Sequence, residues 1–310
     1  MAIWKLEPLA QERIWGGRNL ERFGRVLPEG RKIGETWELV DRPEAQSRIE
    51  GAGQTLGSLW SGSERKKIFG TRSPETDHFP ILIKLLDAEE KLSLQVHPPA
   101  GKAKSLGGEP KTEMWFFLET KPEAEIYVGF NRGVGRVEFE KALKEGKVAD
   151  CFYRQKTEPG EAMFLPSGRV HAIGAGNVIL EIQQNSDTTY RVDDWGRKDE
   201  QGKSRALHVK EALESIQWSD VEPAFVQPRG ERLLVCDFFK VTRWWLAREE
   251  VREIVPDRGT FRFLFVADGK IQTEGGEEWG KGAARFVTAD EDSVILRGVE
   301  ESTVVQVEFV

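Results

Sequence analysis

Short runs in which apolar and polar residues alternate dominate this chain. Most of them are bounded by glycine, proline or aspartate, a pattern typical of half-buried antiparallel strands. The clearest runs lie at Leu92–His97, Glu113–Glu119, Asn177–Gln184 and Thr303–Phe309. Because alternate side chains of a strand point to the same face, each run can turn one face towards a core. The pattern therefore predicts a mainly β protein.

Helical periodicity is confined to three segments that are polar on one face: Leu56–Phe69, Val137–Lys147 and Leu207–Gln217. Beyond the last of them the sequence becomes polar and carries prolines, from Ser219 to Gly230, and we place a domain boundary there. We expect a larger unit with inserted helices over residues 1–220. Residues 231–310 read as short strands separated by turns, which predicts a second, smaller β-domain.

Composition and charge exclude several classes of function. The 310 residues include 45 Lys and Arg against 52 Asp and Glu, a net charge of −7, without a long basic block. We therefore expect no nucleic-acid partner. The N-terminus does not resemble a signal peptide, and no apolar run reaches the roughly 18 residues of a membrane span, so we expect no membrane partner either.

The two cysteines, Cys151 and Cys236, are far apart and form no CxxC pair. This usage fits free thiols in a reducing compartment better than a disulfide, and we expect a cytoplasmic protein. The sequence leaves the oligomeric state open.

Candidate metal ligands occur at spacings that suit strands. Gln95 and His97 are two residues apart, as are Lys111 and Glu113, so each pair can project to one face. The segment GEAMFLPSGRVH, which ends at His171, resembles the second half of a cupin metal-site signature. Two imidazoles, a carboxylate and an amide oxygen suit a divalent ion such as zinc. Either histidine alone would more often be structural, but the combination favours a metal centre.

The histidines also separate the two predicted units. The chain has four, His78, His97, His171 and His208, and none lies in the C-terminal unit. We interpret His78 and His208 as structural residues. The smaller unit, which has no imidazole ligand, is expected to be structural or to shape the substrate site.

Several longer motifs carry a family resemblance: QERIWGG (11–17), GETWEL (34–39), FPILIKLLDA (79–88), LSLQVHP (92–98), KTEMW (111–115), PSGRVHAIGAG (166–176) and LEIQQNSDTTYRVDDWGR (180–197). Together they resemble the short bacterial form of the type I mannose-6-phosphate isomerases, which belong to the cupin superfamily. The resemblance implies a cupin (jelly-roll) barrel with inserted helices and a second, smaller cupin-like β-domain. It also implies a zinc-dependent isomerase, with one zinc ion per chain, that interconverts mannose 6-phosphate and fructose 6-phosphate.

The resemblance extends to individual residues. It implies that Gln95, His97, Glu113 and His171 are the zinc ligands, that Arg191 is the active-site arginine, and that Lys84 and Lys111 are active-site lysines. Longer members of the family carry His-Lys-Pro-Glu around the metal-binding glutamate, whereas this chain has Pro-Lys-Thr-Glu at residues 110–113. A proton-transfer role of that missing histidine is therefore not expected here.

An aldose–ketose isomerisation moves one proton between C1 and C2 through an enediol, so it needs an acid, a base and stabilisation of charge on two oxygens. Lys111 and Glu181 are the candidate proton shuttles, and the pKa of Lys111 would fall if it were desolvated beside a dication. Arg191 can stabilise an enediolate or hold a phosphate. Lys84 and Ser93 are further candidates for binding the phosphorylated hexose.

Two other functions remain open at this point. A cupin oxygenase would use a similar ligand set with redox-active iron and dioxygen. A non-catalytic phosphosugar-binding protein would keep the fold and the ligands without turnover. Metal identity, oxygen consumption and isomerase activity distinguish the three.

Overall fold

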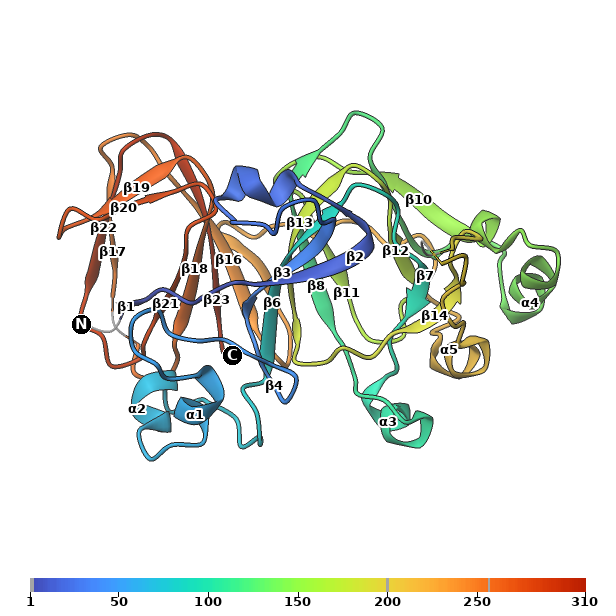
Figure 1. Cartoon of the computed structure of the whole chain (residues 1–310), viewed down its shortest axis with the longest axis horizontal. Coiled ribbons are helices and arrows are strands. Elements are labelled where there is room, and N and C mark those ends of the chain that lie inside the picture. The colour runs from blue at the N-terminus through green and yellow to red at the C-terminus, as the bar shows by residue number, and fades with distance from the viewer. Residues whose placement is uncertain (1–2, 199–200, 256) are drawn as a thin grey trace.

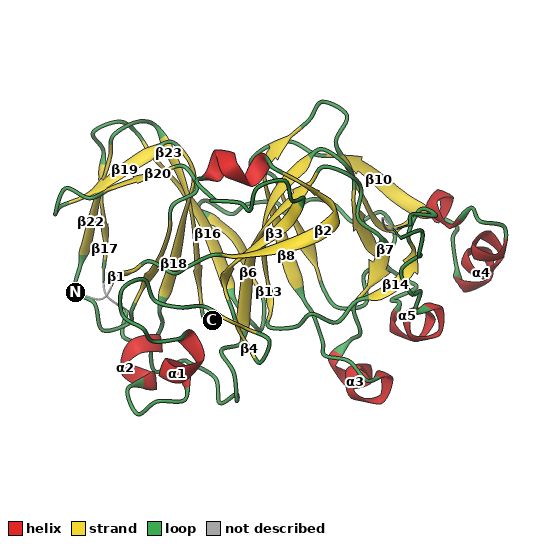
Figure 2. Cartoon of the chain, in the orientation of Figure 1, coloured by secondary structure: helices red, strands yellow, loops and turns green. Residues whose placement is uncertain are grey.

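Two β units lie side by side in the computed structural model, which describes residues 3–198, 201–255 and 257–310 (Figure 1). Strands are the main regular structure of both units, and helices lie at the periphery (Figure 2). The prediction of a mainly β protein is confirmed.

The larger unit contains two sheets in which all ladders between named strands are antiparallel. One sheet has six strands, in the order β11 (Ala162–Leu165), β8 (Glu113–Thr120), β13 (Asn177–Gln184), β6 (Ile81–Ala88), β3 (Ile33–Leu39) and β2 (Leu9–Gly17). The other has five strands, in the order β10 (Phe152–Lys156), β9 (Glu125–Phe130), β12 (His171–Ile173), β7 (Leu94–Val96) and β14 (Tyr190–Asp193). Apolar side chains of both sheets share one cluster, which includes Trp115 and Phe117 of β8 and Ile126 and Val128 of β9, so the sheets face each other.

The smaller unit also contains two sheets. The first has the order β1 (Ile3–Trp4), β21 (Ala284–Val287), β18 (Arg262–Asp268), β23 (Ser302–Glu308), β16 (Lys240–Leu246) and β15 (Arg232–Val235). The second has the order β17 (Val251–Ile254), β22 (Val294–Gly298), β19 (Lys270–Thr273) and β20 (Glu278–Gly280). A separate two-stranded ladder joins β4 (Asp41–Arg42) to β5 (Ala45–Gln46). Because β1 pairs with β21, the N-terminal strand belongs to a sheet of the C-terminal unit. The division of the chain into domains of residues 1–220 and 231–310 stays a prediction.

The helices are short. They are α1 (Leu56–Trp60), α2 (Arg65–Phe69), α3 (Ala100–Ala103), α4 (Arg136–Lys144) and α5 (Val209–Ser215), with 3₁₀ turns η1 (Asn19–Phe23), η2 (Lys104–Leu106) and η3 (Val148–Cys151). The predicted helices that became α4 and α5 are confirmed, although both are shorter than expected.

The prediction of one helix over Leu56–Phe69 is wrong, because α1 and α2 are separate. The break falls at Ser-Gly-Ser, residues 61–63, where glycine and serine are poor helix formers. The N–H of Gly62 donates to the carbonyl of Leu59, which closes the first helix. Both helices lie against the C-terminal unit: the N–H of Phe261 donates to the carbonyl of Phe69, and Trp60 packs near Phe309.

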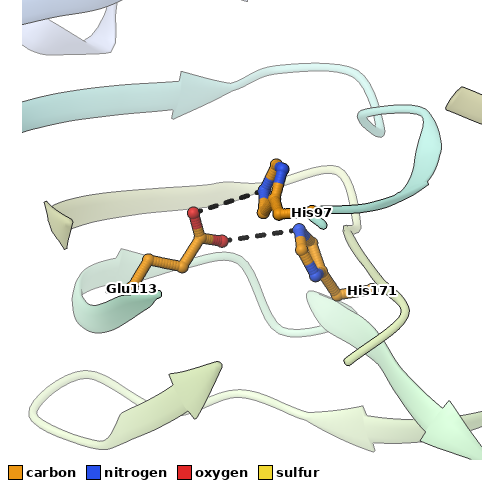
Figure 3. A group of neighbouring side chains, drawn as sticks. All are labelled: His97, Glu113 and His171. Carbon is orange, nitrogen blue, oxygen red and sulfur yellow. Dashed lines mark ion pairs between the residues drawn. The ribbon is translucent and has the colours of Figure 1, made fainter. Parts of the chain in front are cut away.

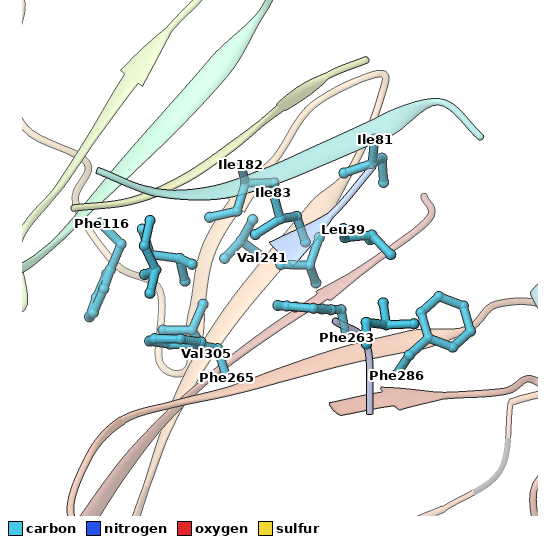
Figure 4. Packing of buried hydrophobic residues seen from close by; sticks show 14 of the residues in the cluster. Leu39, Ile81, Ile83, Phe116, Ile182, Val241, Phe263, Phe265, Phe286 and Val305 are labelled. Carbon is cyan, nitrogen blue, oxygen red and sulfur yellow. The ribbon is translucent and has the colours of Figure 1, made fainter. Parts of the chain in front are cut away.

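The six-stranded sheet has two faces with different roles. On β6, Ile81, Ile83 and Leu85 point away from the five-stranded sheet and enter a core shared with strands of the C-terminal unit. Figure 4 shows Ile83, Ile182 and Phe116 of this sheet opposite Phe263, Phe265 and Val305. Lys84 and Leu86 alternate with these residues and face the interior of the larger unit. One sheet therefore joins the two units on its rear face and carries polar residues on its front face.

Candidate metal centre and adjoining cavity

Strand register aligns the candidate residues in two rows. On the five-stranded sheet, Gln95 of β7 lies opposite His171 of β12 and opposite Arg191 of β14. On the six-stranded sheet, Lys84 lies opposite Glu181. Directly opposite residues of antiparallel strands share a face, so both rows point into the space between the sheets.

His97, Glu113 and His171, which we call the His-Glu-His group, meet at the end of this space (Figure 3). The Nε2 of His97 lies 3.4 Å from Oε2 of Glu113, and the Nε2 of His171 lies 3.4 Å from Oε1 of the same carboxylate. All three side chains are buried, and one ligand atom from each lies within 4.8 Å of the others. Three residues that are 16 to 74 positions apart in sequence therefore converge on one point.

Backbone carbonyls hold both imidazoles from behind. Nδ1 of His97 lies 2.7 Å from the carbonyl oxygen of Thr188, and Nδ1 of His171 lies 2.9 Å from that of Arg169. A carbonyl can only accept, so each Nδ1 carries the proton and each Nε2 presents a lone pair. These are the acceptors expected behind metal-binding imidazoles.

Unsatisfied atoms in the group fit a missing cation. Within the described part of the chain, the buried Nε2 of His97 and Oε1 of Glu113 have no hydrogen-bond partner. Leaving buried acceptors unpaired costs free energy, whereas a bound divalent cation would use their lone pairs. The residues therefore fit a metal ion.

The pKa values favour the same protonation states. Burial lowers the pKa of both imidazoles, that of His171 to about 3, so both are neutral near pH 7. Burial by itself would raise the pKa of Glu113, but the ammonium of Lys111 and the contact with His97 hold it well below its usual range. The group thus offers two neutral imidazoles and one carboxylate.

Gln95 completes the predicted ligand set. Its Nε2 lies 3.3 Å from Nε2 of His171, and its Oε1 accepts from the hydroxyl of Ser93 at 3.2 Å. A half-turn of the amide exchanges the two atoms, and the hydroxyl of Ser93 can accept as well as donate. Ser93, a candidate substrate-binding residue, is therefore in contact with Gln95, a candidate metal ligand.

A cavity of about 410 Å³ adjoins the group. Six of the predicted site residues line it: Lys84, Ser93, Gln95, Lys111, Glu181 and Arg191. The sequence did not single out five other polar lining residues: Arg13, Glu35, Asp187, Thr189 and Arg205. The cavity is thus rich in both cations and carboxylates.

Lys111 and Glu181 lie between the cavity and the His-Glu-His group. The Nζ of Lys111 is 2.8 Å from Oε2 of Glu113 and 3.6 Å from Oε1 of Glu181. Burial opposes the charge on Lys111, but the carboxylates of Glu113 and Glu181 outweigh burial and raise its pKa. From the sequence, a lowered pKa is expected for Lys111 beside a bound dication. The raised pKa is that of the metal-free chain, so it does not test that expectation.

Glu181 is the carboxyl group whose pKa is raised. Burial is the largest cause, and it outweighs the opposing charge of Lys111. Its Oε2 accepts from the indole N–H of Trp115 at 3.0 Å. A buried carboxyl with a raised pKa beside a cavity is typical of groups that exchange protons.

Arg191 lies in the cavity wall. Its Nη1 donates to the carbonyl of Ala206 at 2.9 Å, whereas its buried Nε has no hydrogen-bond partner among the described residues. Burial and the neighbouring Arg205 lower the pKa of Arg191, but a guanidinium remains charged near pH 7.

The two histidines interpreted as structural lie outside the His-Glu-His group. His78 is exposed, with Nδ1 3.5 Å from Oδ1 of Asp41. His208 precedes α5, and its Nδ1 accepts from the backbone N–H of Arg191 at 3.3 Å.

Comparison with known proteins identifies the family. Residues 3–128 match the model of a protein family that is described as "Phosphomannose isomerase type I, catalytic domain". Mannose-6-phosphate isomerase ManA of Bacillus subtilis is 37% identical over 253 residues, which cover 78% of each chain. The chain belongs to the type I phosphomannose isomerase family. The family predicted from the sequence motifs is thereby confirmed.

Solved structures of the family have the same fold. The mannose 6-phosphate isomerase from Bacillus subtilis aligns with a TM-score of 0.84 at 30% identity, over 99% of both chains. A mannose 6-phosphate isomerase bound with zinc and yttrium aligns with a TM-score of 0.76 at 19% identity, also over 99% of both chains, and supports the fold alone. The described residues include no helix that is long and apolar enough to cross a membrane.

Proposed function

We propose that this phosphomannose isomerase family member interconverts mannose 6-phosphate and fructose 6-phosphate with one zinc ion per chain. The observation that carries the proposal is the His-Glu-His group, whose Nε2 atoms converge on one carboxylate beside a cavity lined with cations. Related chains named mannose-6-phosphate isomerases support the choice of substrate. The free thiols of Cys151 and Cys236 agree with a cytoplasmic location.

His97, Glu113 and His171 would hold the zinc ion, with the amide oxygen of Gln95 as the fourth ligand. When bound, the ion would supply positive charge near the sugar oxygens on which negative charge grows. Isomerisation needs no redox step, so a metal without redox chemistry is sufficient.

Glu181 is the proposed base. For the direction from mannose 6-phosphate, its carboxylate removes the proton from C2 while O1 gains a proton, which gives the enediol. The proton held by Glu181 then goes to C1, and O2 loses its proton as the ketone forms, so no proton is gained or lost overall. Its raised pKa brings the carboxyl closer to the working pH, which favours transfer in both directions.

Lys111 and Arg191 are the proposed stabilising cations. The Nζ of Lys111 lies 3.6 Å from Oε1 of Glu181, where it can donate to the enediolate oxygens. Arg191, on the facing sheet, can donate through its guanidinium to the same oxygens or to the phosphate. Lys84 and Ser93 are proposed to bind other oxygens of the substrate.

The test is a coupled assay of fructose 6-phosphate formation from mannose 6-phosphate on one purified sample whose metal content is measured. We expect chelation to abolish turnover and added zinc to restore it. Glu181→Gln should retain zinc but lower kcat by roughly 100-fold or more, because it removes the base and not a ligand.

Two results would overturn this proposal. Oxygen consumption without isomerisation by an iron-loaded sample would favour the oxygenase alternative. Tight binding of mannose 6-phosphate by the zinc-loaded protein without any turnover would favour a non-catalytic binding protein.

A further inference from the structure

Charged side chains of alternating sign lead from the His-Glu-His group to the rim of the cavity. Lys111 lies 3.6 Å from Oε1 of Glu181, and Lys84 lies 3.8 Å from the same oxygen. Beyond Lys84, its Nζ is 3.6 Å from Oε2 of Glu35, which in turn pairs with Arg13. Arg13 is therefore the cation of this series that is farthest from the candidate metal ligands.

Glu35 holds Arg13 by two hydrogen bonds. Nε of Arg13 donates to Oε1 and Nη2 donates to Oε2, both at 3.1 Å, and the indole N–H of Trp37 donates to Oε2 at 2.7 Å. Burial opposes ionisation of Glu35, but Lys84 and Arg13 outweigh it and hold its pKa at about 2. A fixed anion thus lies directly behind two cations of the cavity.

Arg13 retains donors for a ligand. A guanidinium has five N–H groups, of which two go to Glu35 and one, on Nη1, goes to the carbonyl of Glu12 at 3.2 Å. One N–H each on Nη1 and Nη2 remains, and this two-pronged edge suits phosphate oxygens. The side chain of Arg13 is 28% exposed, so this edge lies at the mouth and not in the core.

Lys84 is balanced among three carboxylates. Its ammonium lies 3.6 Å from Glu35, 3.8 Å from Glu181 and 3.8 Å from Asp187, and none of these is within hydrogen-bonding distance. If the charge of Glu35 were removed, the attraction of the other two carboxylates would draw the ammonium towards them. The position of Lys84 in the cavity wall therefore depends on Glu35.

We propose that Arg13 binds the phosphate of the sugar substrate and that Glu35 positions Arg13 and Lys84 for this contact. The inference rests on the proposed function, because a hexose 6-phosphate carries its phosphate at the end opposite C1 and C2. With the reacting carbons beside the His-Glu-His group, the phosphate falls at the far end of the charge series. Arg13 would be a binding residue and Glu35 a positioning residue.

The probe for this inference is glucitol 6-phosphate, a hexitol phosphate that has no carbonyl group and cannot isomerise. Its binding to the zinc-loaded protein is measured by calorimetry, and KM and kcat for mannose 6-phosphate are measured in parallel. We expect Arg13→Gln and Glu35→Gln each to raise the Kd of the probe by roughly tenfold, about 1.4 kcal/mol. KM should rise with it in both variants, while kcat of Arg13→Gln stays within about threefold, because Arg13 does not touch the reacting carbons.

Glu38→Gln is the matched control. Glu38 lies on the same strand, is also buried and pairs with Arg25 through two hydrogen bonds of 2.9 and 2.8 Å. Unlike Glu35, it does not line the cavity. It should lose similar thermal stability to Glu35→Gln and yet leave the Kd of the probe within about twofold. If Glu35→Gln does not fold, Arg13→Gln, which changes a partly exposed side chain, decides the test alone.

An unchanged Kd in Arg13→Gln, or an equal rise in Glu38→Gln, would overturn the inference. So would absence of probe binding to the unaltered protein. If instead the unaltered protein binds the probe through Arg13 but does not isomerise mannose 6-phosphate, the phosphate site stands and the proposed catalytic function fails.

Discussion

One hydrogen bond fixes the protonation of each candidate histidine ligand. His97 and His171 both use Nδ1–H on a backbone carbonyl, so protonation of either ring can occur only at Nε2. That atom lies in a buried space where charge is costly, and it is the atom needed by a metal. Acid should therefore act against both folding and metal binding at the same residues.

The metal-free protein should lose stability as the pH falls below about 6.5. An unfolded chain protonates a histidine near 6.5, whereas folded His171 resists protonation down to about 3, so acid favours the unfolded state across this window. The contribution of His171 to the change in the free energy of unfolding approaches about 1.4 kcal/mol per pH unit. Urea unfolding of the chelated protein at pH 7, 6 and 5 should show a slope that His171→Gln reduces by about this amount. Equal slopes in the two proteins would contradict it.

Candidate site residues that lie in short motifs could be predicted from the sequence. Residues whose role depends on a partner on another strand were missed. Gln95, His97 and Glu113 could be singled out because strand spacing is visible in a motif. Arg13 and Glu35 form a pair only because β2 and β3 are neighbours, which the sequence does not state. The i, i+2 spacing of Glu35 and Trp37 in GETWEL is a signal that could have suggested an inward carboxylate.

At the scale of the strand, close backbone packing of β2 on β3 positions the outer part of the cavity. A Cβ atom at Gly16 would lie 2.3 Å from the backbone N of Gly34 and 2.4 Å from the carbonyl carbon of Ile33. These backbone atoms cannot rotate aside as a side chain could. Arg13 and Glu35 lie on the same two strands, so their pairing depends on this contact.

Gly16→Ala should therefore separate β2 from β3. We expect a loss of about 1–3 kcal/mol of stability, as for other overpacked sites, together with a higher KM for mannose 6-phosphate. Gly280→Ala is the control, because it also lies on a strand and a Cβ there would meet no atom within 4 Å. Chemical denaturation and steady-state kinetics measure both effects, and equal stability of the two variants would contradict the packing argument.

Strand content was readable from the sequence because alternation survives wherever one face is polar. Helix ends were less accessible, as the break between α1 and α2 shows, because a single apolar periodicity continues across the Ser-Gly-Ser turn. Sheet membership was not accessible at all for β1. Two residues at the N-terminus pair with a strand about 280 positions later, and no local pattern specifies such a pairing.

At the scale of the molecule, the two units share one apolar core. Phe263, Phe265 and Val305 of the C-terminal unit pack with Ile83 and Ile182 of the six-stranded sheet. Removing the C-terminal unit would expose the rear of the sheet that carries Glu181 and Lys84. We therefore expect the smaller unit to support the candidate site, even though it contributes no candidate metal ligand.

Phe263→Ala should destabilise both units together. Loss of a fully buried phenylalanine costs about 3–5 kcal/mol, and because the cavity opens in the shared core we expect one cooperative transition at lower temperature. Trp245→Ala, which alters a half-exposed ring of the same unit, is the control and should change stability far less. Calorimetry of the zinc-loaded protein would contradict this if the larger unit melted separately at its original temperature.

Apolar side chains fill the interior between the two sheets of the smaller unit, whereas the larger unit has a polar cavity between its sheets. Trp244 and Trp279 are fully buried there, packed with Leu246, Ile271 and Leu296. The absence of histidine from this region was visible in the sequence, but the filling of its interior by two indoles was not, because a buried tryptophan looks the same in any core.

The two-faced sheet also restricts how this enzyme can change its length. A substitution on β6, β8 or β13 can alter either the face that lines the cavity or the face that packs on the C-terminal unit, because successive side chains point to opposite faces. Insertion or deletion of one residue within such a strand would exchange the two sets, turning Lys84 or Glu181 into the interdomain core and isoleucines into the cavity. Chain length between consecutive turns is therefore as constrained here as the identity of the candidate metal ligands.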